Sequence, residues 1–196
     1  MAKHLFLIGP TGCGKTTLLR CTLGPYLSQA GGFVTDAVYG SYGELCSYTL
    51  SPAASAGGVA GFTAETFLDC SHFPPRTDNE VFRDTGVRLL REAVWYPFAM
   101  LDEIGGFELI IPQFRTALFE LLRSDLPLIG ALKTQEEADA LRQTLGLGDK
   151  CRTYLRELRC MLEHDADTQL LVVHSTRDLA HAGEVLAVWR QEQLEK

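Results

Sequence analysis

The sequence predicts an α/β domain built on a mostly parallel β-sheet, and three observations support this prediction. Apolar runs of strand length alternate along the chain with segments of helical period. A glycine-rich loop joins the first apolar run to the first helical segment. An acidic pair, Asp102 and Glu103, follows a later apolar run. Because ligands bind at the carboxyl ends of the strands in such sheets, the loop and the acidic pair indicate a site at that edge.

The composition favours one globular domain spanning residues 1–196. Apolar residues make up 46% of the chain and charged residues 22%, which is enough to form a core. The net charge of −7 disfavours nucleic acids and anionic membranes as partners, because an acidic surface repels phosphates. No apolar run approaches the roughly 20 residues of a membrane span, and the six cysteines lack zinc or disulfide spacing. We therefore expect a cytoplasmic monomer with reduced cysteines.

In the first part of the chain, a strand is predicted at His4–Ile8 and a helix at Lys15–Leu23. Two β-rich runs, Gly32–Tyr39 and Glu44–Leu50, flank the sequence GSYG and predict a hairpin. Ser, Ala, Gly and Pro dominate Ser51–Pro75, where we predict a mobile loop because no periodicity is visible.

The second part of the chain continues the alternation of helices and strands. Three further strands are predicted, at Phe98–Leu101, Leu126–Leu132 and Gln169–Val173. Five helices are predicted, at Thr77–Ala93, Pro112–Ser124, Thr134–Gly146, Asp149–Glu163 and Asp178–Leu194. Capping-box patterns begin the first and third of these helices, at Thr77 and Thr134. The expected sheet has about five core strands with an added hairpin.

The loop GPTGCGKT matches G-x-x-x-x-G-K-[ST] and predicts a cradle for the phosphates of a nucleoside triphosphate. Glycines let successive backbone N–H groups converge on phosphate oxygens, and the following helix presents its positive N-terminus. Lys15 would bridge the β- and γ-phosphates, and the Thr16 hydroxyl would bind Mg²⁺. The predicted nucleotide-binding residues are Gly9, Pro10, Thr11, Gly12, Cys13, Gly14, Lys15, Thr16 and Thr17.

The acidic pair supplies the chemistry that a phosphate cradle lacks. Asp102 would hold Mg²⁺ through water, and Glu103 would orient and deprotonate an attacking water. The same residues also match D-x-x-G, a pattern typical of GTPases. That alternative predicts an N-K-x-D motif after a later strand, but the chain reads KTQEEADA and HSTRDLAH at those places.

The ordered pieces GPTGCGKTTLL, GGFVT, LDEIGGFEL, PLIGALK and TRDL resemble a small nucleoside-triphosphatase family that includes the cancer-related nucleoside triphosphatase and thermophile relatives. The resemblance implies a P-loop three-layer sandwich and Mg²⁺-dependent hydrolysis of several nucleoside triphosphates to diphosphate and phosphate. It assigns Lys15 and Glu103 to catalysis and places Arg177 near the nucleotide. Phe107 and Ile111 depart from the residues that are common in the family, Met and Ser.

Three functions fit these observations. The leading hypothesis is a hydrolase acting on ATP, GTP, CTP and UTP, because no base-recognition motif is present. A nucleotide or small-molecule kinase would use the same loop, exclude water and be stimulated by an acceptor. A nucleotide-dependent switch or assembly factor would bind the triphosphate tightly with negligible turnover.

Overall fold

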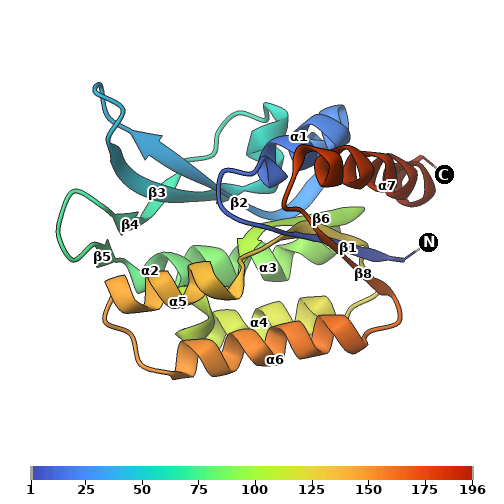
Figure 1. Cartoon of the computed structure of the whole chain (residues 1–196). Helices are drawn as coiled ribbons and strands as arrows, with labels where there is room; N and C mark the ends of the chain where they lie inside the picture. Colours follow the sequence, from blue (N-terminus) through green and yellow to red (C-terminus); the bar gives the residue numbers. More distant parts are fainter. Residues whose placement is uncertain (1, 196) are drawn as a thin grey trace.

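The computed structural model describes residues 2–195 and is organised around one eight-stranded sheet with the order β5-β4-β3-β2-β6-β7-β1-β8 (Figure 1). Strands β2, β6, β7, β1 and β8 are parallel, whereas β3, β4 and β5 extend the sheet in antiparallel pairing. The strands are β1 His4–Ile8, β2 Ala30–Tyr39, β3 Leu45–Pro52, β4 Glu65–Asp69, β5 Arg76–Thr77, β6 Phe98–Ile104, β7 Leu128–Leu132 and β8 Thr168–Val172.

Helices cover both faces of the sheet and make the three layers of the predicted sandwich. Figure 1 shows α1 and α7 over one face, with α3, α4, α5 and α6 over the other. The helices are α1 Lys15–Leu23, α2 Asn79–Val81, α3 Val87–Glu92, α4 Pro112–Leu122, α5 Gln135–Thr144, α6 Lys150–His164 and α7 Thr176–Leu194. Short 3-10 turns η1 Gly24–Gln29, η2 Ala53–Gly57, η4 Ala93–Trp95 and η5 Phe107–Ile110 connect them, and α2 joins α3 through a π-helical turn, η3 Phe82–Gly86.

Two hydrophobic clusters, one on each face, hold the layers together. In β1, Leu5 and Leu7 pack with α1 and α7, whereas Phe6 packs into the cluster under α3, α4 and α6. This alternation follows from the two-residue period of a strand. All three side chains are fully buried, which explains why β1 reads as one continuous apolar run.

The parallel core and the β2–β3 hairpin are confirmed, but the prediction of a loop at Ser51–Pro75 is wrong. β3 continues to Pro52, and a further strand, β4, pairs antiparallel with it. β4 is only five residues long, and its buried side chains are the adjacent Phe67 and Leu68. So short a segment shows no clear hydrophobic period. It is ordered by pairing with β3, which the local sequence does not indicate.

The helices are confirmed with small shifts at their ends. The capping box predicted at Thr77 is wrong: the N-cap is Asp78, whose carboxylate accepts from the Glu80 N–H at 2.9 Å, while Thr77 belongs to β5. The capping box between Thr134 and Glu137 is confirmed at the start of α5. A capping box at the start of α7, formed by Ser175 and Asp178, was not predicted.

The remaining global predictions concern cysteines and membranes. All six cysteines are free, in agreement with the absence of a disulfide framework. Within residues 2–195, no helix is both long enough and apolar enough to cross a membrane.

Candidate nucleotide-binding site

The glycine loop turns directly from β1 into α1 and leaves the start of that helix open. Gly14 is the N-cap of α1 with φ 102°, a left-handed conformation that strongly favours glycine. No side chain caps α1, and its first turn has no acidic residue. Since the first N–H groups of a helix have no carbonyl partners within it, these donors are available to an anion.

Lys15 is buried at the base of this loop, with only 4% of its side chain exposed. Its Nζ donates to the carbonyl oxygens of Gly9 at 2.5 Å and Pro10 at 3.1 Å. The same ammonium lies 3.4 Å from Oε1 of Glu103. The structure therefore brings the loop lysine and the predicted base together, although 88 residues separate them in the sequence.

Asp102 and Glu103 belong to the last residues of β6, which extends to Ile104 instead of ending at Leu101 as predicted. Asp102 is fully buried, and its Oδ1 accepts from the Thr16 hydroxyl at 2.9 Å. Its Oδ2 is buried without a hydrogen-bond partner. Burial raises the pKa of Asp102 to about 6, against the lowering effect of the Thr16 hydrogen bond.

Thr16 and Asp102 fit a Mg²⁺ site of the P-loop type. A buried carboxylate oxygen without a partner beside a threonine hydroxyl offers the hard oxygen ligands that Mg²⁺ prefers. In the part of the chain that the structure describes, no cluster of three or more His, Cys, Asp or Glu side chains is arranged to hold a metal by itself. The protein would thus supply Thr16 and Asp102, and phosphate oxygens and water would complete the coordination.

Lys133, which sequence analysis did not assign to the site, is the second cation on Glu103. It follows β7, and its Nζ lies 2.5 Å from Oε2 of Glu103. Burial opposes the charged ammonium, but the adjacent Glu103 carboxylate raises the pKa of Lys133. Glu103 is therefore held between two ammonium groups. A lysine directly after a predicted strand was the signal in the sequence that could have revealed Lys133.

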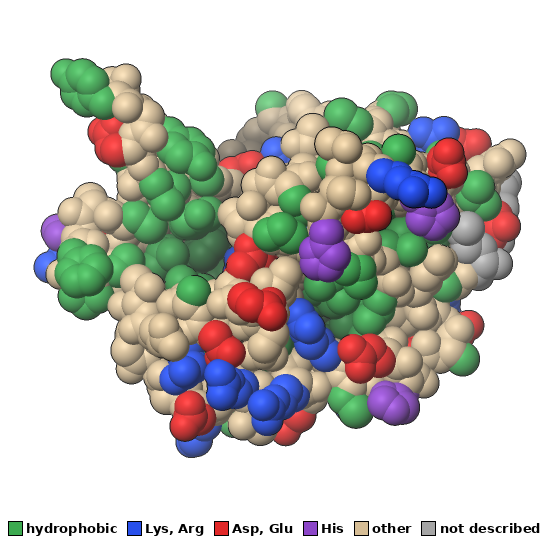
Figure 2. All heavy atoms as spheres, in the orientation of Figure 1, with side chains coloured by type: hydrophobic (Ala, Val, Ile, Leu, Met, Phe, Trp, Pro, Cys, Tyr) green, Lys and Arg blue, Asp and Glu red, His purple; other side chains and the backbone are tan. Residues whose placement is uncertain are grey.

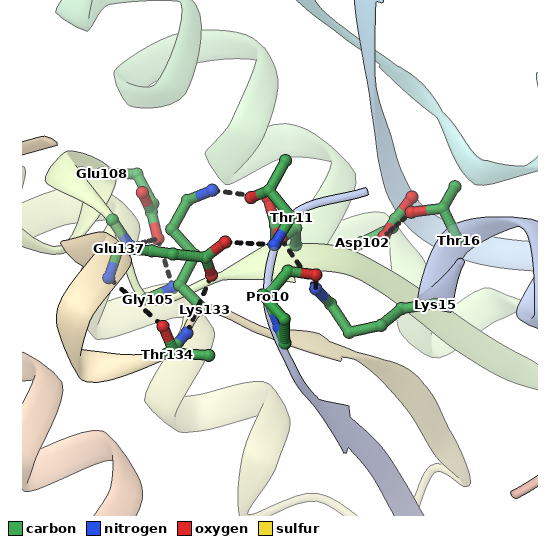
Figure 3. A network of polar contacts seen from close by, with 12 residues as sticks. Pro10, Thr11, Lys15, Thr16, Asp102, Gly105, Glu108, Lys133, Thr134 and Glu137 are labelled. Carbon is green, nitrogen blue, oxygen red and sulfur yellow. Dashed lines mark hydrogen bonds and ion pairs between the residues drawn. The ribbon is translucent and has the colours of Figure 1, made fainter. Parts of the chain in front are cut away.

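Glu137 links α5 to the glycine loop. Its carboxylate accepts the backbone N–H of Thr11 and that of Thr134. Burial works against the charge of Glu137, but the hydrogen bonds from Thr11 and Thr134 lower its pKa. In Figure 3, Thr11 separates Glu137, Glu108 and Lys133 from Lys15, Thr16 and Asp102 on the other side. The local capping box thus also fixes the position of the loop.

A cavity of about 270 Å³ lies over the loop, which we call the phosphate cavity. The β2–β3 hairpin forms its far wall. Arg20 of α1 ties the hairpin to the helix through Asp36, at 2.8 Å. The lining residues are Thr11, Gly12, Gly14, Lys15, Thr16, Thr17, Thr35, Asp36, Ala37, Tyr39, Tyr48 and Glu103.

Most predicted site residues meet at this cavity, but Arg177 does not line it. Asp102 lies beneath Thr16, and the carbonyls of Gly9 and Pro10 hold Lys15. Arg177 is exposed in the first turn of α7. That turn packs near the loop, because a Cβ at Gly14 would touch Leu179 at 3.4 Å. Arg177 lies two residues before Leu179 in this turn, and its catalytic role stays a prediction.

Comparisons with known proteins agree with this geometry. Residues 4–179 match the model of a family described as NTPase. The chain is 30% identical over 158 residues to the nucleoside-triphosphatase THEP1 of Thermofilum pendens, covering 76% of this chain and 84% of that protein. The crystal structure of THEP1 from the hyperthermophile Aquifex aeolicus superposes with a TM-score of 0.52 at 16% identity, over 82% of this chain and 99% of that one, and supports the fold. The chain therefore belongs to this family of P-loop nucleoside triphosphatases, enzymes that hydrolyse a phosphoanhydride bond.

Proposed function

We propose that the protein hydrolyses nucleoside triphosphates to diphosphate and phosphate in a Mg²⁺-dependent reaction, with little selectivity for the base. The observation that carries the proposal is the convergence of Lys15, Asp102 and Glu103 at the glycine loop. Mg²⁺ bound near Thr16 and Asp102 would neutralise phosphate charge.

The roles of the side chains follow from their positions. The loop N–H groups and Lys15 bind the β- and γ-phosphates and stabilise the charge that develops during transfer. Glu103 orients a water molecule, whose oxygen bonds to the γ-phosphorus as the bond from that phosphorus to the β–γ bridging oxygen breaks. The water proton passes to the Glu103 carboxylate. Lys133 holds this carboxylate in place from the opposite side, at 2.5 Å.

The proposed low selectivity for the nucleotide base is supported by the segments that follow β7 and β8. An N-K-x-D base-recognition motif is absent after both strands, where the chain continues with Lys133–Thr134 and with Val173–His174. The D-x-x-G match at Asp102–Gly105 therefore has no accompanying guanine-reading element in the described chain. We expect ATP, GTP, CTP and UTP to be turned over at similar rates.

The test is phosphate release from these four nucleotides, with Mg²⁺ and with EDTA, for wild type and Glu103→Gln. Glu103→Gln should lower turnover by roughly 10²–10⁴-fold, the usual contribution of a general base, while nucleotide binding persists. Glu157→Gln, an exposed position on α6, is the matched control. Unchanged turnover in Glu103→Gln would remove Glu103 from the mechanism. A strong preference for one nucleotide base would contradict the proposed lack of base selectivity.

A further inference from the structure

A second, larger cavity of about 380 Å³ lies beside the phosphate cavity, and hydrolysis alone does not require it. It opens between the antiparallel strands β3 and β4, the helical segment after Asp78, and α5. Figure 2 shows a hollow lined by hydrophobic side chains at the base of the projecting β2–β3 hairpin. We call it the acceptor cavity. Its lining residues are Thr11, Thr35, Tyr48, Phe67, Leu68, Phe82, Glu103, Phe107, Glu108, Lys133, Glu137, Ala140, Leu141 and Thr144.

The two cavities share one wall. Thr11, Thr35, Tyr48 and Glu103 line both of them. Glu103 follows Asp102 and contacts Lys15, so the shared wall is on the side of the cradle where the γ-phosphate would lie. A molecule in the acceptor cavity would therefore meet the reacting end of the nucleotide with Glu103 between them.

The inner wall of the acceptor cavity is aromatic. The rings of Phe67 and Phe82 lie 4.9 Å apart, those of Phe67 and Phe107 5.9 Å apart, and those of Tyr48 and Phe67 6.3 Å apart. The three phenylalanines are buried among one another in the core. This wall is preformed and apolar, which is the character of pockets for small organic molecules with planar or apolar bodies.

The polar end of the cavity is acidic. Three carboxylates line it, those of Glu103, Glu108 and Glu137. Glu103 is paired with the ammonium groups of Lys133 and Lys15, so Glu108 and Glu137 are the two carboxylates without an ammonium partner in this lining. Glu108 is 4% exposed, and its Oε1 accepts the N–H groups of Gly105 and Gly106 at 2.7 and 2.8 Å. Such an end accepts hydrogen bonds from hydroxyl or ammonium groups and repels anions.

We propose that the acceptor cavity binds a small neutral or cationic molecule with an aromatic or apolar body and a hydroxyl group directed at Glu103, and that this hydroxyl takes the γ-phosphoryl group in place of water. The proposal depends on the phosphate cradle and on the role of Glu103 proposed above. The hydroxyl oxygen bonds to the γ-phosphorus, and the bond from that phosphorus to the β–γ bridging oxygen breaks. The hydroxyl proton passes to Glu103, and the nucleoside diphosphate leaves.

The experiment uses three probes that share a 4-hydroxyphenyl body and differ in one end group. Tyramine is cationic, 4-hydroxyphenethyl alcohol is neutral, and 4-hydroxyphenylacetate is anionic. Saturation-transfer NMR measures their binding in the presence of ADP, and phosphorus NMR with MgATP measures the phosphorylated probe against free phosphate. Ala140→Trp fills the mouth of the cavity from the exposed side of α5, and Gln143→Trp is the control on the same helix outside the lining.

We expect the cationic and neutral probes to bind and to be phosphorylated. The anionic probe should bind at least about tenfold more weakly, and Ala140→Trp should lower the phosphorylated fraction at least about tenfold, as misfit in an apolar pocket does. Gln143→Trp should behave as wild type. Any one of four results would overturn the proposal. Both favoured probes could fail to bind, or ADP could displace them. Binding could be insensitive to Ala140→Trp, or the reaction could release free phosphate alone. If wild type does not hydrolyse MgATP in the absence of a probe, the proposed function is overturned instead.

Discussion

The buried carboxyl group of Asp102 makes a quantitative prediction about stability. Its side chain is fully buried, and one of its oxygens has no hydrogen-bond partner. Ionisation is therefore costly in the metal-free protein, and Asp102→Asn should relieve that cost because the amide stays neutral.

The magnitude follows from the pKa of Asp102. Raising this pKa from the usual 3.8 to about 6 corresponds to about 3 kcal/mol. The folded state binds the proton more tightly than the unfolded state. The contribution of the protonated carboxyl group to the free energy of unfolding is therefore fully present below pH 3.8 and is lost as the pH rises to about 6. Above about pH 6, Asp102→Asn should be more stable than wild type by up to about 3 kcal/mol.

Urea unfolding in EDTA, followed by fluorescence of the buried Trp189, measures this difference. Between about pH 4.5 and about pH 7.5, the free energy of unfolding of wild type should fall by about 2 kcal/mol relative to that of Asp102→Asn. This is the part of the full effect that the pH range covers. Glu163→Gln, an exposed position on α6, should follow the wild-type profile. Parallel profiles for wild type and Asp102→Asn would refute the reasoning that burial of Asp102 governs its ionisation.

Three further predictions concern Lys133, Arg177 and Glu137. Lys133→Met should lower kcat with little effect on nucleotide Kd, because it frees the Glu103 carboxylate; an unchanged kcat in phosphate-release assays would contradict the positioning role. Arg177→Ala should lower kcat by roughly 10³–10⁵-fold if Arg177 acts on the transition state, and equal turnover and affinity would end that role. Glu137→Gln should destabilise the fold by about 0.5–1.5 kcal/mol, because one of the N–H groups of Thr11 and Thr134 exchanges its carboxylate acceptor for water. Thermal unfolding against the exposed control Glu136→Gln measures that loss, and equal stability of the two variants would refute it.

Local spacing was sufficient for the elements whose physical cause is local. The loop from Gly9 to Thr17 and its helix were predictable because glycine conformation and the start of a helix depend on neighbouring residues. The capping box at Thr134 is another case, since its two hydrogen bonds join residues three apart. The apolar strands of the parallel core were predictable for the same reason: burial on both faces gives a continuous run.

Features with a non-local cause could not be read in this way. β4 is ordered by pairing with β3, and the helix expected to start at Thr77 starts after Asp78 because β5 takes Thr77 into the sheet. In both cases tertiary contacts outweigh the local pattern.

The sequence by itself determined the identity of the phosphate cradle and of the acidic pair, because each is a contiguous pattern. Only the tertiary structure decided what surrounds them. The strand order β6-β7-β1 brings Lys15, Glu103 and Lys133 to one edge, and α5 presents Glu137 to Thr11 across 126 residues. The acceptor cavity likewise collects side chains from β3, β4 and α5. The physical reason is that the carboxyl ends of parallel strands converge in space, and residues distant in the chain meet there only after the sheet has formed.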